Sequence, residues 1–157
     1  MRKRIALAFS LLVVLNFSAV NAQVINGDSI FESLSSEPGI PARGRAIVAS
    51  RQTGLCLLCH SGPFPEERFQ GNLAPELKAS AARLNAPQLR ARIVNAAHFN
   101  PQTIMPAYYQ TSHLNRVAPK FIGQTILSGQ EIEDVIAFLT SLNNQNNWNA
   151  DEKRNSI

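Results

Sequence analysis

Cysteine is scarce in this sequence, because the 157 residues include only two, at positions 56 and 59. A pair separated by two residues closes at most one very small loop, so a framework of disulfides cannot stabilise the chain. Beyond the first 22 residues there is also no run of the roughly 18 to 20 consecutive apolar residues that a membrane-spanning helix needs. We therefore expect no membrane span in the mature chain, and we expect the two cysteines to serve another purpose.

A basic surplus is missing too, once the N-terminus is set aside. Residues 2–4 are basic, residues 5–15 are apolar, and a small-residue site ends at Ala22, which is the pattern of an export signal. Without residues 1–22 the chain has 135 residues, 12 basic against 11 acidic, and a formal charge of +1 in place of +4. This balance excludes nucleic-acid binding of the usual kind. We predict a signal peptide over 1–22 and a periplasmic location, with a retained N-terminal anchor as the alternative.

The remaining chain reads as one small all-α domain, because apolar residues recur at helical spacing and no strand pattern is present. Helices are expected near 41–50, 75–84, 87–98 and 128–142, with one short helical turn at 56–60. The long segment 100–127 has three prolines and many apolar residues, so we expect it to wrap around something buried. The predicted organisation is a lead-in segment with little structure of its own (23–40), one helical domain (41–142) and a frayed polar tail (143–157).

The residues Cys56-Leu57-Leu58-Cys59-His60 form a Cys-x-x-Cys-His sequence, the attachment signature of c-type haem. On one helical turn the two thiols face the same way, so both can form thioethers with one porphyrin edge, and His60 then reaches the iron as the proximal ligand. Three other interpretations remain: a redox disulfide, half of a zinc site completed by His98 and His113, and a chance structural disulfide.

The sixth position of the iron has few candidates. Met105 is the only methionine left after removal of the signal peptide, and it lies in the long apolar segment just before Pro106. His98 and His113 are the rivals, and an ordinary packing role for Met105 is the alternative. A His/Met pair saturates the iron, which suits electron transfer rather than oxygen binding.

Five further side chains are candidates for contacts with the predicted haem or with a partner. An arginine can meet haem propionates or a partner, although a solvated basic helix face is the commoner role. A tyrosine can hydrogen-bond near the haem, although packing is the commoner role. These residues are Arg83, Arg90, Arg92, Tyr108 and Tyr109.

The sequence resembles the class I cytochromes c and, among them, the SoxX family, the monohaem cytochrome subunits of the bacterial sulfur-oxidation system. The resemblance covers about 44–142 and rests on the following segments: Cys56 to His60, Phe69-Gln70-Gly71-Asn72-Leu73-Ala74-Pro75 with Leu77, Ala82-Arg83-Leu84, Asn100-Pro101-Gln102-Thr103-Ile104-Met105-Pro106-Ala107-Tyr108-Tyr109, Arg116-Val117-Ala118-Pro119, and the helix from Glu131 to Leu142. The run Ile-Met-Pro-Ala-Tyr-Tyr points to SoxX, whereas the first motif marks any c-type cytochrome.

The resemblance implies a small class I cytochrome c fold around one covalent haem c. By this likeness Cys56 and Cys59 carry the thioethers, His60 is the proximal ligand and Met105 the distal one. The carbonyl near Pro75 would hold the other imidazole nitrogen of His60. Gly44 and the last helix around Phe138 would form the terminal helix crossing typical of the fold.

The resemblance also implies partners. Members of the family form heterodimers with SoxA, whose haem-ligating cysteine joins thiosulfate to a carrier-protein cysteine, an L-cysteine S-thiosulfotransferase reaction. SoxX accepts the released electrons and passes them to a soluble cytochrome c. With both cysteines committed to haem, no thiol here remains to carry sulfur, so this subunit would not be catalytic alone. The alternatives are a free-standing electron shuttle, a colourless zinc or disulfide module, and a gas-binding sensor.

Overall fold

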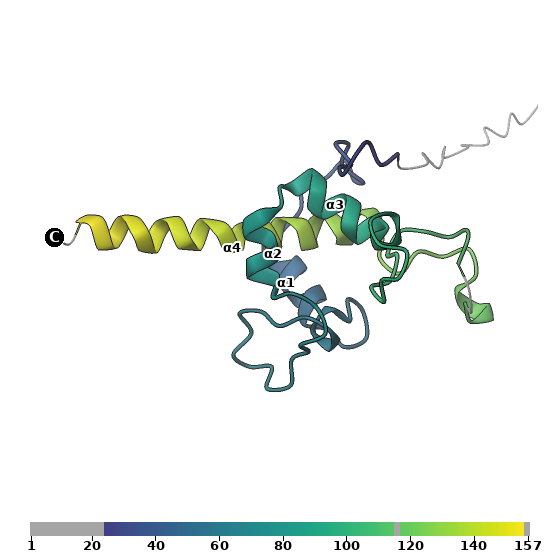
Figure 1. Cartoon of the computed structure of the whole chain (residues 1–157), viewed down its shortest axis with the longest axis horizontal. Coiled ribbons are helices and arrows are strands. Elements are labelled where there is room, and N and C mark those ends of the chain that lie inside the picture. Colours follow the sequence, from purple (N-terminus) through teal and green to yellow (C-terminus); the bar gives the residue numbers. More distant parts are fainter. Residues whose placement is uncertain (1–23, 115–116, 156–157) are drawn as a thin grey trace, which may run out of the picture.

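A computed structural model describes residues 24–114 and 117–155, so the predicted signal peptide lies outside the described residues. The elements follow in the order α1 (Pro41–Ala49), η1 (Cys56–Leu58), α2 (Leu77–Arg83), α3 (Ala86–Val94), η2 (Ala96–His98), η3 (Pro119–Phe121) and α4 (Gly129–Asn155), where η marks a short 3₁₀ turn (Figure 1). Within these two ranges there is no strand beyond one isolated bridge between Asn26 and Ser29. The predicted all-α class is confirmed.

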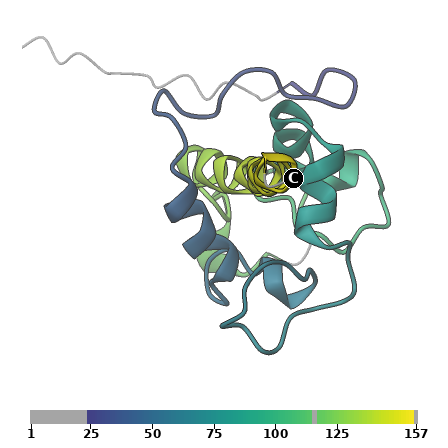
Figure 2. The same ribbon diagram turned by 90° about the vertical axis from the view of Figure 1, so that its left-hand side faces the viewer.

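Helix α4 is the centre of the domain. Viewed along its axis, α1 lies on one side of it and α2 and α3 on the other (Figure 2). Its apolar positions recur at helical spacing and are almost fully buried, each worth about 1.5–3 kcal/mol relative to exposure. These positions are Ile132, Val135, Ile136, Leu139 and Leu142.

Helices α1 and α4 cross at closest approach beside Gly44. A Cβ atom at Gly44 would lie 1.9 Å from the carbonyl oxygen of Asp134 and 2.9 Å from the Cβ of Phe138. Only a residue without a side chain lets the two backbones come this close. The expected crossing between Gly44 and the helix around Phe138 is confirmed.

Helix α3 is shorter than predicted. Asn85 and Gln88 form the expected capping box at its start, but the helix ends at Val94 rather than near His98. The reason is competition for acceptors, because the carbonyls of Ile93 and Val94 accept the backbone N–H groups of Tyr108 and Tyr109 at 3.1 and 3.4 Å. Those carbonyls would otherwise accept the amides four residues on and extend the helix.

Helix α4 is longer than predicted. Its start follows expectation, because Ser128 and Glu131 exchange hydrogen bonds in the spacing of a capping box. The helix then continues to Asn155, so the prediction of a frayed tail from residue 143 is wrong over most of its length. No proline follows Gly129 and no further glycine occurs within the helix, and asparagine costs a helix only a fraction of the roughly 1 kcal/mol that glycine costs.

The lead-in segment has no helix, as expected, yet it is tied firmly to the domain. Ile30 is 1% exposed, and its carbonyl accepts a hydrogen bond from Arg90 at 2.7 Å. Arg90 also pairs with Glu133 of α4 through two bonds of 2.7 and 2.9 Å, and Glu133 accepts the amide of Leu34. The interpretation of Arg90 as part of a solvated basic face is therefore wrong.

In the described part of the segment 100–127, two apolar side chains are almost fully buried. Tyr108 and Leu127 are buried, and the carbonyl of Tyr108 accepts the amides of both Ile126 and Leu127. The chain therefore leaves the core after Tyr109 and returns to the same place. The expectation that the segment wraps around something buried does not extend to all of its apolar residues, because Ile104, Leu114, Phe121 and Ile122 are exposed.

Candidate functional site

The turn η1 presents the two cysteines. The amides of Cys59 and His60 both bond to the carbonyl of Cys56, at 3.2 and 2.9 Å, and the buried Leu57 anchors the turn in the core. Residues three apart eclipse each other on a 3₁₀ turn, so Cys56 and Cys59 lie on one side of it. Both thiols are free and half-buried.

The entry to this turn is a strained backbone. Leu55 has φ +59°, a left-handed conformation that a residue with a Cβ rarely adopts, and Gly54 lies where a Cβ would be 2.2 Å from the carbonyl oxygen of Ile47. The amide of Leu55 bonds to the carbonyl of Ser50 at 2.9 Å. Helix α1 and the loop after it thus hold the strained turn in place.

The loop between η1 and α2 packs closely under the turn. The amide of Gly71 bonds to the carbonyl of Leu57, and a Cβ at Gly71 would lie 2.3 Å from the carbonyl oxygen of Leu58. Gln70 holds the loop from inside, because its side chain accepts from the amide of Gly62 at 2.7 Å and donates to the carbonyl of Phe64 at 2.8 Å. This packing brings Pro75, further along the same loop, beside His60.

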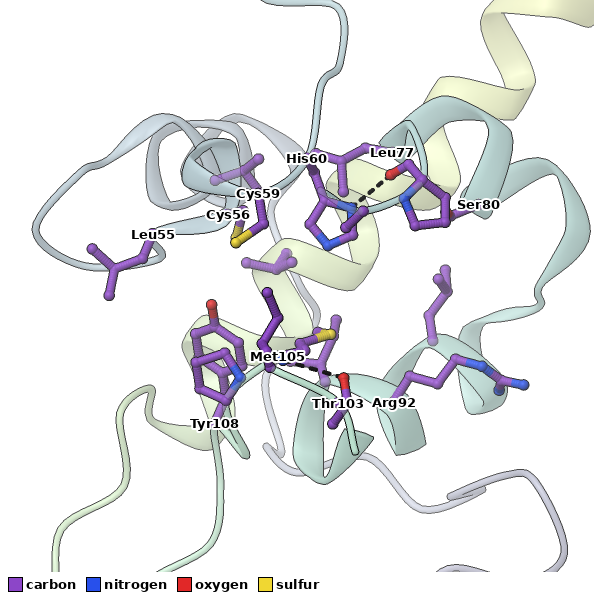
Figure 3. A pocket seen from close by; sticks show the side chains of 18 of the residues that line it. Leu55, Cys56, Cys59, His60, Leu77, Ser80, Arg92, Thr103, Met105 and Tyr108 are labelled. Carbon is purple, nitrogen blue, oxygen red and sulfur yellow. Dashed lines mark hydrogen bonds between the residues drawn. The ribbon is translucent and has the colours of Figure 1, made fainter. Parts of the chain in front are cut away.

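His60 is oriented by a backbone carbonyl. Its Nδ1 lies 2.6 Å from the carbonyl oxygen of Pro75, as the resemblance implied (Figure 3). Because a carbonyl only accepts, Nδ1 must carry the proton, which leaves Nε2 with a free lone pair. The other edge of the ring faces the pocket, so this lone pair is available to a metal there.

A cavity of about 850 Å³ lies between this turn and the segment that carries Met105. Cys56, Cys59 and His60 border it on one side and Met105 borders it on the other, so the structure brings all four predicted site residues together (Figure 3). Its volume is within the range of about 300–1,000 Å³ found for small-molecule and cofactor sites. The rest of the lining is mainly apolar and comes from all four α-helices and their ends. It includes Val48, Leu77, Leu84, Leu89, Ile93, Val135 and Leu139.

Met105 is half-buried, and its amide bonds to the hydroxyl of Thr103 at 3.2 Å. The two rival ligands lie elsewhere. His98 is exposed and stacks edge-on against Phe99, and His113 is exposed with φ +58°. Neither histidine lines the cavity, so the geometry favours Met105 as the side chain facing His60.

Two of the three other interpretations of the cysteine pair, the redox disulfide and the zinc site, fit the site poorly. Burial raises the pKa of the Cys56 thiol to about 11, although a hydrogen bond involving Tyr108 opposes this effect. A redox disulfide needs a thiolate and hence a lowered pKa, so this environment disfavours it. For zinc, no group of three or more His, Cys, Asp or Glu side chains gathers into a metal site anywhere in 24–114 or 117–155.

Two of the three arginines considered in the sequence, Arg83 and Arg92, line the cavity. Arg92 also stacks over the ring of Phe99 at 4.6 Å. The sequence favours packing as the role of Tyr108, with hydrogen bonding as the alternative; the residue is 4% exposed and its hydroxyl donates to the carbonyl of Gly54 at 2.5 Å. No sequence motif predicts the bond from Tyr108 to Gly54, because its acceptor is a backbone atom 54 residues away.

Comparison with known protein families finds no family model that matches, and no curated protein matches either. Among solved structures, the chain is similar to the crystal structure of SoxXA from P. pantotrophus, with 34% sequence identity and a TM-score of 0.69. The match covers 76% of this chain and 93% of that one. The chain belongs to the SoxX family. Its fold is accordingly the small all-α fold of a class I cytochrome c, as the resemblance implied.

Proposed function

We propose that this SoxX-family protein is a periplasmic monohaem cytochrome c that transfers electrons in thiosulfate oxidation, as one subunit of a SoxAX-type complex. The observation that carries the proposal is the placement of Cys56, Cys59, His60 and Met105 around one apolar cavity. Two thiols, an oriented imidazole and a thioether are the donor set of a c-type haem, so the residues present fit the group.

Each of these residues has a definite part in holding the haem. Cys56 and Cys59 would carry the thioether bonds, and Nε2 of His60 would bind the iron on the side of the attachment turn. The carbonyl of Pro75 keeps the proton on Nδ1 and fixes the plane of the ring. Met105 would bind the iron from the opposite side. Haem c with this ligand pair supplies one-electron transfer between iron(III) and iron(II).

The apolar lining would help to set the reduction potential of a bound haem. Leu89 and Ile93 from α3 and Val135 and Leu139 from α4 are buried and line the cavity. A low-dielectric setting would disfavour the higher net charge of oxidised iron.

The partner is proposed by analogy with the related structure, whose name, SoxXA, denotes a complex. We infer a SoxA-like haem subunit as the stable partner, with a carrier protein and a soluble cytochrome c as transient ones. The chain has two cysteines and both face the haem site, so sulfur transfer belongs to another subunit.

Among residues 24–114 and 117–155, none of the helices combines the length and the hydrophobicity that a membrane span requires.

Purification of the tagged protein from the periplasm of the bacterium that naturally produces it tests the proposal, with haem staining of each denatured band. A stained band at this subunit's mass and a stoichiometric second stained band are the expected result. A single stained band would favour a free-standing electron shuttle over the complex. An unstained subunit would refute the haem assignment altogether.

The ligand assignment is tested by Met105→Ala, with His98→Ala and His113→Ala as matched controls. Loss of the thioether should leave haem attached but open the sixth position, seen as a high-spin iron(III) spectrum and as carbon monoxide binding by the reduced protein. The two histidine variants should keep the spectrum of the parent. An unchanged spectrum for Met105→Ala would show that another group binds the iron.

A further inference from the structure

Tyr108 connects three parts of the domain that the sequence keeps far apart. Its backbone amide bonds to the carbonyl of Ile93 in α3, and its carbonyl accepts the amides of Ile126 and Leu127 just before α4. Its hydroxyl reaches in a third direction, to the carbonyl of Gly54 at 2.5 Å. The segment that carries Met105, three residues earlier, is therefore fastened at Tyr108.

The acceptor of the hydroxyl lies at the most constrained point of the attachment turn. The carbonyl of Gly54 also lies 3.4 Å from the sulfur of Cys56, and Leu55 between them is left-handed. A strained residue keeps its conformation only where its surroundings hold it. The bond from Tyr108 is one such restraint, and it comes from the opposite side of the cavity (Figure 3).

We propose that Tyr108 is a positioning residue whose hydroxyl ties the segment of Met105 to the turn of Cys56, and so holds the distal thioether at a fixed separation from His60. The inference rests on the proposed haem site. Burial holds the pKa of Tyr108 above its ordinary value, so the hydroxyl stays a donor at neutral pH. Tyr108 acts through Met105 and the turn, and it is not itself a ligand.

Tyr108→Phe tests the tie, because it removes the hydroxyl and keeps the ring. The loss should let Met105 leave the iron more often. We expect the methionine-to-iron(III) charge-transfer band to weaken, and added imidazole to bind the oxidised protein about fivefold more tightly, the factor that corresponds to one hydrogen bond of ordinary net strength.

Tyr109→Phe is the matched control, since it removes a hydroxyl from the next residue, whose side chain does not line the cavity. This variant should match the parent in both measurements. Equal effects of the two substitutions would refute the tie, as would a Tyr108→Phe protein that is less stable but binds imidazole like the parent.

A second measurement covers the case in which Tyr108→Phe does not accumulate. The chain has two tyrosines, so the Tyr109→Phe protein keeps only Tyr108 and can be produced with 3-fluorotyrosine. The more acidic phenol is a stronger donor and should weaken imidazole binding, and unchanged or tighter binding would refute the proposal. A parent protein without covalent haem, or without the charge-transfer band, would instead refute the proposed haem site or its methionine ligand.

Discussion

Replacing Arg90 by methionine should destabilise the protein more than any other single loss of charge described here. Both Arg90 and Glu133 are 8% exposed, and Arg90 makes three hydrogen bonds: two to Glu133 and one to the carbonyl of Ile30. Burial acts to raise the pKa of Glu133, but hydrogen bonds from Arg90 and the amide of Leu34 lower it by more, so the carboxylate is ionised. Arg90→Met leaves that charge buried without its cation.

The expected cost of Arg90→Met is about 3–5 kcal/mol in the free energy of unfolding, the usual effect of removing one partner from a buried ion pair. Urea unfolding of the haem-loaded protein, followed by far-UV circular dichroism, measures it. The double variant Arg90→Met/Glu133→Leu should recover much of the loss, because no unpaired charge remains. Glu66→Gln, which breaks an exposed ion pair with Arg45, should change the urea midpoint of unfolding very little. A loss below about 1 kcal/mol for Arg90→Met would refute the reasoning.

Three further predictions concern backbone approach and pH. Gly44→Ala should lower the melting temperature sharply, because its Cβ would lie 1.9 Å from a carbonyl of α4, whereas Ala46→Gly in the same helix should have a small effect. Gly71→Ala should reduce the yield of covalent haem, measured by haem staining per unit protein, because its Cβ would push against the attachment turn. A hydrogen bond from Arg43 lowers the pKa of Asp134 below its ordinary 3.8, so this contribution to stability is present above that value and is lost as pH falls through the lower pKa in the folded protein. Urea midpoints measured from roughly pH 6 to 3 should therefore fall more steeply for the parent than for Asp134→Asn.

Much of the fold could be predicted from periodicity and helix caps. The face of α4 from Ile132 to Leu142, its cap at Ser128 and the short turn at Cys56 all follow from spacing alone. The end of α3 could not be predicted, because the amides that compete for its last carbonyls come from Tyr108 and Tyr109, in a segment with no period of its own. The five asparagines from 143 to 149 suggest fraying, but asparagine only weakly disfavours a helix, so α4 continues through them.

The candidate site was predictable where side chains define it, and unpredictable where the backbone does. Cys56, Cys59, His60 and Met105 stand out because few residue types can hold a haem, and the chain has few of each. The burial of Arg90 is unpredictable for a related reason: its partners are Glu133 and a carbonyl of the lead-in segment, and neither is near it in sequence. A local pattern shows that an arginine is present, but not whether distant residues bury it.

Backbone carbonyls frame both sides of the site, and this explains which substitutions it can tolerate. His60 is oriented by the carbonyl of Pro75, Tyr108 by that of Gly54, and the segment after Met105 by that of Ile93. Every residue has a backbone carbonyl, so the side chain of the acceptor residue matters only through its effect on the path of the backbone. The donors must keep their chemistry, whereas the acceptors must keep their place in the chain, and Gly54 must be glycine because a Cβ there would lie 2.2 Å from the carbonyl oxygen of Ile47.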